Sequence, residues 1–400
     1  MADGARRDID RRAMNAGPLQ GIRVVELGGI GPGPFAAMLM ADLGAEVVRI
    51  DRPPREPLGE HQQHERDLLL RGRRSIALDL KSADGVEVAL RLTDRADVLL
   101  DPFRPGVAER LGIGPETATS RNPGLVYARM TGWGQTGPLA SVAGHDLNYV
   151  ALAGPLAAMG RRGSPPAPAL NLIGDFGGGG MLLAFGVTAA LVERNRSGRG
   201  QVIDVAMTDG VAALSASIVG FTNMGVWRPE RESNFLDGGA PYYDSYETSD
   251  GRHVTIGSIE PQFYALLLDK LGLDAAEWPQ DDRRRWPELH ARLAEIFRGR
   301  TRDEWCELLE GTDVCFAPVL GFDEAPKHPH LAARGTYVEE HGMLQPAPVP
   351  RFSRTPGAIQ TPPCSPGQHT REVLADWGFT SEEQAAAIAS GVAVVSTTAG

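Results

Sequence analysis

The sequence predicts an α/β protein with a Rossmann-like large domain, built on a parallel sheet, and a smaller α+β domain. Three observations support this prediction. Short β-branched runs alternate with helical patterns over the first 130 residues, a βαβ unit spans residues 23–51, and a hairpin pattern follows residue 226. A chain of 400 residues is long enough for two domains that each bury a core.

In chain order, the βαβ unit reads as a strand at 23–27, a turn at 28–34, a helix at 35–43 and a strand at 46–51. After a polar loop at 53–72, the same alternation continues. We expect strands at 75–80, 96–101 and 124–130, with an amphipathic helix at 83–95.

The turn after the first strand has the G-x-G-x-x-A spacing of a dinucleotide fingerprint, at residues 31–36. A pyrophosphate needs backbone N–H groups there, and Pro32 and Pro34 have none. A nicotinamide dehydrogenase is therefore the least favoured reading. A tight turn with Pro34 near the start of the helix is preferred.

After residue 180 the sequence contains longer apolar runs. Residues 181–193 are apolar almost all round and predict a buried helix, and the apolar stretch 202–219 predicts a long connecting helix. We assign 17–225 to the large domain with its linker helix and 226–335 to the small domain. Residues 336–400 form a C-terminal segment that is proline-rich at 346–366, a composition suited to wrapping over a surface, with a capping box at Thr380 and Glu383.

The composition argues against several classes of binding partner and site. The net charge of −11 argues against a general nucleic-acid binder, and no run approaches 18 apolar residues, so we expect no membrane span. Three widely spaced cysteines indicate neither a disulfide framework nor a zinc site, which favours a reducing cytoplasm. Residues 1–16 lack the apolar region of a signal peptide and predict a disordered extension.

Residues 144–180 carry the candidate chemistry. His145 and Asp175 each sit beside a glycine and lead into an apolar, helix-compatible run, which places both near helix N-termini. Because the positive end of a helix favours a carboxylate, we expect Asp175 to stay ionised. Gly177 to Gly180 leave backbone N–H groups open to a small polar atom. These are the parts for proton transfer beside a carbonyl, although a flexible loop with a structural histidine fits the stretch equally well.

With these elements in place, the chain resembles the class III (family III) CoA-transferase superfamily over residues 17–395. Any one matching segment is weak, but their number and order make the resemblance specific. The segments are LQGIRVVEL (19–27), DLGAEVV (42–48), DLK (79–81), FRPGV (103–107), GQTGP (134–138), GHD (144–146), DFGG (175–178), RGQVIDV (199–205) and YETSDG (246–251).

The resemblance implies an interlocked homodimer, a C-terminal segment 336–400 that returns to the large domain, and an acyl-CoA thioester as substrate. The implied chemistry requires no metal or redox cofactor. In transferases of the superfamily, the aspartate matching Asp175 is the nucleophile. In its racemases, that aspartate pairs with a histidine matching His145, so the Gly-His-Asp triplet points to a racemase. The implied reaction interconverts (R)- and (S)-2-methylacyl-CoA, with His145 and Asp175 as acid and base on opposite faces of the α-carbon.

The resemblance also implies roles for other residues. Glu260 matches a glutamate that contacts the histidine, although a solvent-facing position is the alternative. Asn171 would support the aspartate loop or form a turn, and Tyr149 would line the thioester or pack in the core. The remaining candidates contact CoA, as phosphate ligands or beside the nucleotide: Arg52, Leu78, Leu80, Lys81, Arg104 and Arg110.

Two other functions stay open from the sequence. A CoA transferase would move CoA between carboxylic acids through an anhydride on Asp175. A non-catalytic acyl-CoA-binding protein would keep the fold and bind CoA without exchange or transfer.

Overall fold

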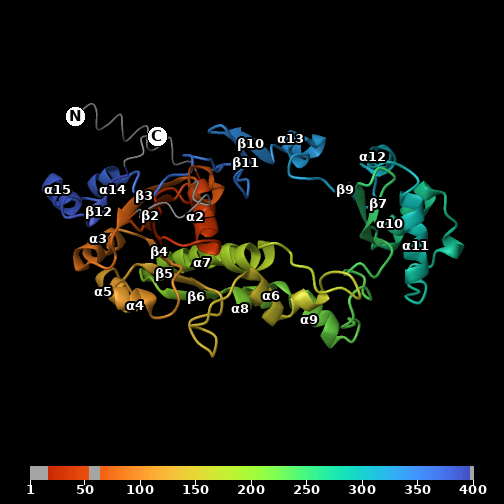
Figure 1. Cartoon of the computed structure of the whole chain (residues 1–400), viewed down its shortest axis with the longest axis horizontal. Helices are drawn as coiled ribbons and strands as arrows, with labels where there is room; N and C mark the ends of the chain where they lie inside the picture. The colour runs from red at the N-terminus through yellow and green to blue at the C-terminus, as the bar shows by residue number, and fades with distance from the viewer. Residues whose placement is uncertain (1–16, 54–63, 397–400) are drawn as a thin grey trace. The chain divides into compact units, whose positions relative to one another are not determined.

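A computed structural model describes residues 17–53 and 64–396 of the chain (Figure 1). The predicted N-terminal extension, residues 1–16, and part of the polar loop lie outside these ranges. The chain divides into two compact units. Unit 1 holds residues up to Ala153, Leu170–Leu214 and the segment from Gly335 onward, and unit 2 holds Gly154–Ala169 and Ser215–Arg334.

Unit 1 is built on a seven-stranded sheet in the order β12-β3-β2-β1-β4-β5-β6. Six strands are parallel, which confirms the predicted parallel sheet, and their order is that of a doubly wound fold. The parallel strands are β1 (Arg23–Leu27), β2 (Glu46–Asp51), β3 (Arg73–Leu78), β4 (Val98–Asp101), β5 (Val126–Thr131) and β6 (Val202–Ala206).

Helices cover both faces of this sheet. Successive strand residues point to opposite faces, so Val24 lies in one buried cluster and Val25 in the other. The Val24 face packs against α2 (Pro32–Asp42) and α7 (Leu182–Ser197). The Val25 face packs against α3 (Ala83–Thr93), α5 (Pro115–Arg121) and α14 (Thr370–Asp376). Unit 1 also contains α4 (Val107–Leu111), α6 (Asp146–Ala153) and α8 (Met207–Leu214).

The C-terminal segment packs on unit 1. It contains the hairpin of β10 (Tyr337–Glu340) and β11 (Met343–Pro346), α15 (Ser381–Ala389) and the short strand β12 (Ala393–Val394). β12 runs antiparallel beside β3 at the edge of the sheet. The indole of Trp377, 1% exposed, donates a hydrogen bond to Glu46, and α15 begins with the predicted capping box at Thr380.

Unit 2 surrounds an aromatic core. The predicted hairpin is confirmed as β7 (Tyr243–Glu247) and β8 (His253–Gly257), joined by a third strand, β9 (Phe316–Pro318). Its helices are α9 (Ala216–Asn223), α10 (Pro261–Leu271), α11 (Trp286–Phe297), α12 (Arg302–Leu309) and α13 (Pro329–Arg334). The core includes Tyr246, Trp278, Trp286, Phe297 and Trp305.

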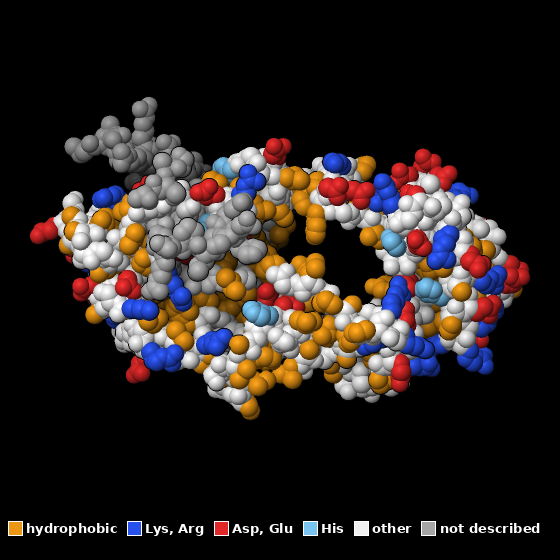
Figure 2. Space-filling model, viewed as in Figure 1, with side chains coloured by type: hydrophobic (Ala, Val, Ile, Leu, Met, Phe, Trp, Pro, Cys, Tyr) orange, Lys and Arg blue, Asp and Glu red, His pale blue; other side chains and the backbone are white. Residues whose placement is uncertain are grey.

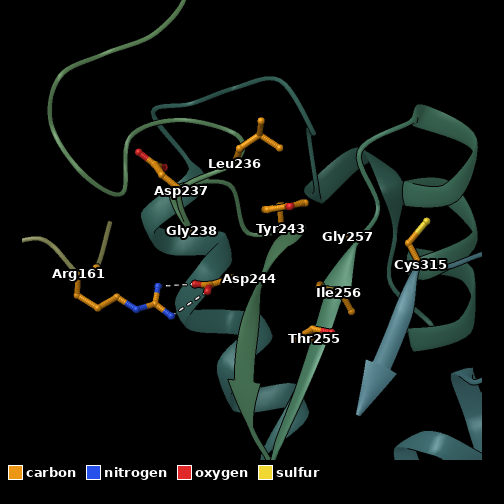
Figure 3. Close-up of a pocket in the computed structure, with 11 residues that line it drawn as sticks. Arg161, Leu236, Asp237, Gly238, Tyr243, Asp244, Thr255, Ile256, Gly257 and Cys315 are labelled. Carbon is orange, nitrogen blue, oxygen red and sulfur yellow. Dashed lines mark hydrogen bonds and ion pairs between the residues drawn. The ribbon is translucent and has the colours of Figure 1, made fainter. Parts of the chain in front are cut away.

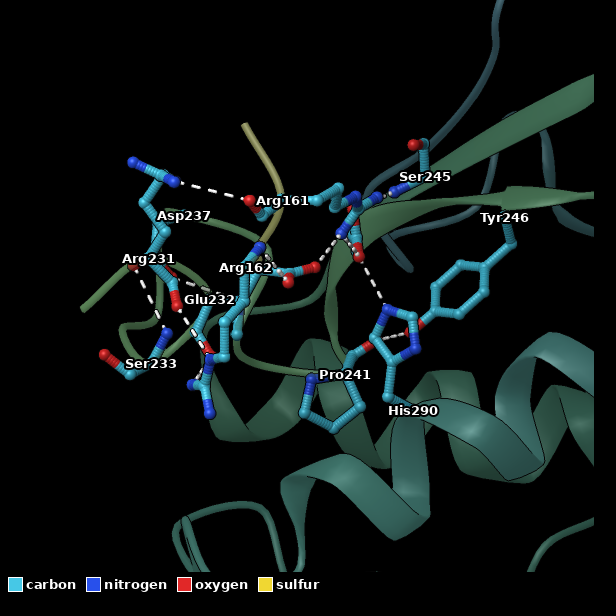
Figure 4. A network of polar contacts seen from close by, with 12 residues as sticks. Arg161, Arg162, Arg231, Glu232, Ser233, Asp237, Pro241, Ser245, Tyr246 and His290 are labelled. Atoms are coloured by element: carbon cyan, nitrogen blue, oxygen red, sulfur yellow. Dashed lines mark hydrogen bonds and ion pairs between the residues drawn. The ribbon is translucent and has the colours of Figure 1, made fainter. Parts of the chain in front are cut away.

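A polar network explains why Gly154–Ala169 belongs to unit 2 and not to the large domain assigned from the sequence. Arg161 makes a two-pronged ion pair with Asp244, at 2.6 and 2.8 Å, and a further contact with Glu232 (Figure 4). The same Asp244 carboxylate lies 2.6 Å from Nε2 of His290. Arg231 reaches back to backbone carbonyls of the segment. The segment is therefore held by charged contacts that no local pattern reveals.

Two sequence expectations about helices were wrong. Residues 202–219 form β6, α8 and α9 instead of one long helix, because residues 202–206 pair with β5 as an edge strand. The helix after the glycine run is buried on one side only: Leu183 and Val187 are in the core, while Phe185 is 70% exposed. Periodicity cannot separate a buried helix from one with an apolar outer face.

The same stretch bears on the expectation about membrane spans. Among the described residues, Leu172–Ser197 is a helical stretch of 26 residues with a mean hydropathy of 1.5 in its most apolar window, enough by length and composition to cross a membrane. Of that window, 39% is buried inside the structure. A helix packed in a protein core passes the same test, so the finding says nothing more about location.

His369 gives unit 1 a predicted pH dependence. Its Nδ1 accepts a hydrogen bond from the Ser75 N–H, and burial lowers its pKa, with a smaller opposing effect from Glu372. Below about pH 6.5 the unfolded state binds a proton that the folded state resists, so stability falls as pH falls. Urea unfolding between about pH 7.5 and pH 5.5 measures this slope.

The variant His369→Asn, whose amide oxygen still accepts a hydrogen bond, is expected to flatten that slope. His341→Asn, at an exposed position of the same unit, is the matched control. Equal slopes in wild type and His369→Asn would show that His369 does not carry the effect.

Candidate active site

The candidate site lies at the carboxyl ends of β1 and β4, where the strand order of the sheet reverses. The turns after these strands touch, because a Cβ built on Gly29 would lie 2.7 Å from Pro102. The first turn also meets Asp175: a Cβ on Gly31 would lie 3.2 Å from its Oδ2. Crevices of this kind are the usual ligand sites of open α/β sheets.

Asp175 is carried by a π-helix, η4 (Leu172–Met181), which continues directly into α7. Such helices are rare and are frequent at functional sites. The glycines allow close packing: a Cβ on Gly178 would lie 2.9 Å from α8, and one on Gly179 would lie 2.9 Å from Pro32 of α2. The sequence predicted that backbone N–H groups of the glycine run would be open to a small polar atom. For Gly178, Gly179 and Gly180 this prediction was wrong, because these residues are buried.

The Asp175 carboxyl is less acidic than the sequence led us to expect. Burial raises its pKa, and the negative charge of Asp146 raises it further. A hydrogen bond from Asn171, at 3.5 Å, and the positive charge of His145 act in the opposite direction but do not prevail. The sequence favoured a lowered pKa for Asp175 near a helix end, whereas burial and the charge of Asp146 shift the pKa of its carboxyl upward. A carboxyl of this kind is suited to giving and taking a proton.

His145 lies immediately before α6, with its side chain exposed. Its backbone N–H donates to Oδ1 of Asn148 at 3.0 Å, and its carbonyl accepts from the backbone N–H groups of Asn148 and Tyr149. The backbone is thus fixed at a helix start, as the sequence predicts. Within the described ranges, no hydrogen bond to the imidazole is found, so the ring is accessible to a substrate.

Tyr149 packs in the core, one of the two positions that the sequence left open. Its ring is buried, edge-on to Trp133 at 4.7 Å between centroids, and so close to residue 132 that only glycine fits there. Burial and the charge of Asp175 raise the pKa of its hydroxyl, while Arg104 opposes them. Tyr149 therefore packs in the core and also places its ring beside the Asp175 carboxyl.

The sequence reading missed the role of Asp146, which is 8% exposed at the first position of α6. Its Oδ2 accepts hydrogen bonds from the backbone N–H groups of Gly174, at 2.6 Å, and Asp175, at 2.8 Å. The only local signal is an acidic residue at the start of a helix, which is common. The contact joins positions 28 and 29 residues apart.

Of the residues predicted to contact CoA, three line one cavity and the others lie outside it. Leu80, Lys81 and Arg110 line one cavity of about 340 Å³, together with Ser82, Ala83, Val86 and Leu111. Arg104 and Arg52 are exposed elsewhere on unit 1. Leu78 is 1% exposed in the core, paired with Ala393 of β12, so its side chain faces the sheet interior and not a nucleotide.

Glu260 belongs to unit 2, at the N-cap of α10, and is exposed. Its charge helps to raise the pKa of the Cys315 thiol, so the two side chains are close. Cys315 lines a cavity of about 510 Å³ that also includes Tyr243, Asp244 and Thr255 (Figure 3). Because His145 lies in unit 1, the pairing of Glu260 with His145 stays a prediction.

No group of three or more His, Cys, Asp or Glu side chains arranged to hold a metal ion is found within residues 17–53 and 64–396.

The contact of Gly31 with Asp175 gives a testable prediction. Gly31 has φ +68°, and its missing side chain lets the carboxylate approach. Gly31→Ala is expected to lower the turnover of any reaction at Asp175 by up to about 10²-fold through displacement of the carboxylate. Gly21→Ala is the matched control, since Gly21 has φ +88° and open space around its Cβ position. Similar turnover in the two variants would contradict the prediction.

Comparison with known proteins places these features in context. The model of the family described as CoA-transferase family III matches residues 19–370. Alpha-methylacyl-CoA racemase of Mus musculus is 50% identical over 369 residues, covering 91% of this chain and 94% of the mouse protein. The Homo sapiens racemase is 46% identical over 372 residues, with the same coverage of each chain. A solved CAIB/BAIF family protein from Brucella suis gives a TM-score of 0.76 at 26% identity, covering 91% of this chain and 100% of its own.

Proposed function

The chain belongs to CoA-transferase family III, and from this premise we propose that it is a racemase that interconverts the R and S epimers of 2-methylacyl-CoA thioesters. The high identity to two alpha-methylacyl-CoA racemases supports this reaction. The observation that carries the proposal is the site itself. A half-buried carboxyl of raised pKa, Asp175, and an accessible imidazole, His145, interact electrostatically at the crevice of the sheet.

The two groups suit a 1,1-proton transfer. The thioester carbonyl makes the α-proton acidic enough for a positioned base to remove it, which leaves an enolate-like intermediate. One group removes the proton from one face of the α-carbon, and the other delivers a proton to the opposite face. Because burial raises the pKa of Asp175, its carboxylate is a stronger base than an exposed one, and the carboxyl that it forms can return the proton as the acid.

The enolate-like oxygen needs hydrogen-bond donors. The N–H groups of Gly174 and Asp175 are already engaged by Asp146. The first N–H groups of a helix have no intrahelical partner, and α6 begins at Asp146. The N–H groups of Asp146 and Leu147, next to His145, therefore suit the role of oxyanion donors.

Substrate binding is assigned to the cavity lined by Leu80, Lys81 and Arg110. Lys and Arg side chains bind phosphate, Arg through two parallel hydrogen bonds. Apolar side chains beside them suit an adenine ring. We assign the CoA phosphates and nucleotide to this cavity.

We also propose a homodimer. Unit 1 exposes large apolar side chains on elements that pack against one another, over α6 and α8 among others (Figure 2). They are Leu147, Leu152, Leu172, Met181, Phe185, Val192, Val202 and Leu214. Exposed apolar side chains that gather on neighbouring elements mark an interaction site. A second copy of the chain would cover it, and a monomer mass in sedimentation velocity would contradict the dimer.

The test is incubation of the pure protein with (R)-2-methylacyl-CoA in deuterated water, with the α-proton followed by NMR. Exchange and formation of the S epimer, without any added acid, is the expected result. Absence of exchange, with CoA transfer once a second carboxylic acid is supplied, would instead make Asp175 the nucleophile of a CoA transferase. Tight CoA binding with neither reaction would indicate a non-catalytic binding protein.

A further inference from the structure

Asp146 connects the two proton-transferring groups. It follows His145 directly in the chain, at the first position of α6, and its buried carboxylate reaches the loop that carries Asp175. One oxygen, Oδ2, accepts from both Gly174 N–H and Asp175 N–H. The same residue is therefore bonded covalently to one acid–base group and by hydrogen bonds to the backbone of the other.

These bonds satisfy donors that the π-helix leaves open. The first N–H groups of any helix have no partner within it, and Asn171, the N-cap of η4, makes no side-chain capping bond. Asp146 supplies the cap from another element. A carboxylate that accepts backbone N–H groups makes shorter and stronger hydrogen bonds than a neutral acceptor. The start of η4 is thereby fixed to the start of α6.

The close contact between the loop backbone and the Asp146 carboxylate leaves no room for a side chain at Gly174. A Cβ at that position would lie 2.7 Å from Asp146 Oδ2, closer than any real carbon–oxygen contact. Gly174 is buried, so the loop backbone, and not a side chain, lies against the carboxylate.

We propose that Asp146 is a positioning residue for the acid–base pair: its carboxylate holds the Asp175 backbone at a fixed place relative to His145. This inference rests on the proposed racemase function, in which the two groups must face one α-carbon from opposite sides. A displacement of about 1 Å can cost about 10²-fold in rate. A rigid cap joining both groups meets that requirement.

Asp146 also acts on Asp175 through its charge. Its negative charge raises the pKa of the Asp175 carboxyl, after burial the largest cause. Of the other titratable groups, His145 acts on the Asp175 carboxyl, and Tyr149 on α6 responds to its charge. Among the elements packed against η4, α8 carries the exposed Asp209 and β6 carries Asp204. α2 carries Asp42 at its far end, paired with Arg71, and α7 carries Glu193, Arg194 and Arg196 in its last turns.

Two substitutions separate the roles. Asp146→Asn keeps an oxygen that accepts the two N–H groups but removes the charge, whereas Asp146→Ala removes both. Asp97→Asn is the matched control, because the Asp97 carboxylate also accepts a backbone N–H, from Arg23 at 2.7 Å, at the amino ends of β1 and β4. Thermal unfolding checks that each variant is folded.

The first readout is the kinetics of epimerisation. Asp146→Ala is expected to lower kcat by about 10²-fold with KM changed little, since the loss is in alignment and not in CoA binding. Asp146→Asn is expected to retain more activity, with the acid limb of its pH profile moved to lower pH. Asp97→Asn should match wild type. Folded Asp146→Ala with wild-type kcat would overturn the proposal.

The second readout does not depend on activity. Carbon-13 NMR of aspartate labelled at Cγ, with the Asp175 signal assigned from Asp175→Asn, follows that carboxyl directly. Its pKa is expected to fall in Asp146→Asn and to stay unchanged in Asp97→Asn. In Asp146→Ala, the backbone amide signals of Gly174 and Asp175 should shift or broaden. If wild type shows no α-proton exchange, the racemase proposal fails, while unchanged Asp175 titration and amide signals overturn the role of Asp146 independently.

Discussion

Replacing Asp175 with asparagine is expected to lower kcat for epimerisation by about 10²- to 10⁴-fold, the usual range for loss of a general acid or base. The substitution keeps the size of the side chain and removes its ability to exchange a proton. The loop backbone should hold its place, because Asp146 binds the N–H groups of the loop and not the Asp175 side chain. Asp209→Asn, an exposed carboxylate on α8, is the matched control.

The isotope pattern tests the pairing with His145 more sharply than the rate does. If the two groups serve opposite faces, Asp175→Asn should retain α-deuterium exchange on the epimer whose proton faces His145, without inversion. His145→Gln should retain exchange only on the other epimer. Loss of exchange on the same epimer in both variants would contradict the two-group mechanism, as would epimerisation at the wild-type rate after either substitution.

The second large effect is on stability. Arg71 and Asp42 are each 1% exposed and form a two-pronged ion pair, and Arg71 also donates to Gln345 and to the Pro346 carbonyl of the returning segment. Arg71→Met leaves the Asp42 carboxylate buried without a cation. Breaking a buried pair in this way is expected to cost about 3–5 kcal/mol in the free energy of unfolding.

The pH dependence of that loss has a defined sign. Burial already raises the pKa of Asp42 and Arg71 opposes the rise, so the pKa rises further in Arg71→Met. The variant then favours protonated Asp42, and its deficit should shrink as pH falls. Urea unfolding of Arg71→Met, compared with Arg121→Met at an exposed ion pair where the loss should be under about 1 kcal/mol, measures both points.

A double variant, Arg71→Met with Asp42→Leu, is expected to recover much of the loss because it removes the stranded charge. Equal destabilisation by Arg71→Met and Arg121→Met would show that burial of the pair does not set its contribution.

Most of the parallel sheet was predictable because its strands carry short apolar runs, and β1 and β2 begin and end where the pattern indicates. β9 was missed because it is three residues long and ends in Pro318, which weakens any strand signal. Leu78 was expected to flank a nucleotide, but it is the last residue of β3 and its side chain is buried in the cluster against which Leu80 also packs. No local pattern shows where burial ends along a strand. Segment 202–219 was misread because an apolar run does not distinguish an edge strand from a helix.

In the candidate site, too, some features could be predicted from the sequence and others could not. His145 and Asp175 could be named from the residues beside them and from the family resemblance. The π-helix could not be predicted, because the hydrogen bonds between residues i and i+5 that define it have no sequence signature distinct from that of an α-helix. The bonds from Gly174 and Asp175 to Asp146 span nearly thirty residues, and only the tertiary fold brings them together. The raised pKa of Asp175 depends on the same long-range contacts.

Unit 1 is discontinuous along the chain, and this affects the order in which the protein matures during synthesis. The ribosome delivers residues from the N-terminus, and domains fold as their residues emerge. Unit 2 is complete once Arg334 has left the ribosome, whereas unit 1 still lacks everything from Gly335 onward. Until Ala393 and Val394 emerge, the outer edge of β3 keeps unpaired backbone groups that can recruit a foreign strand. The catalytic unit is therefore the last to be finished and has the longest period of vulnerability to misassembly on the ribosome.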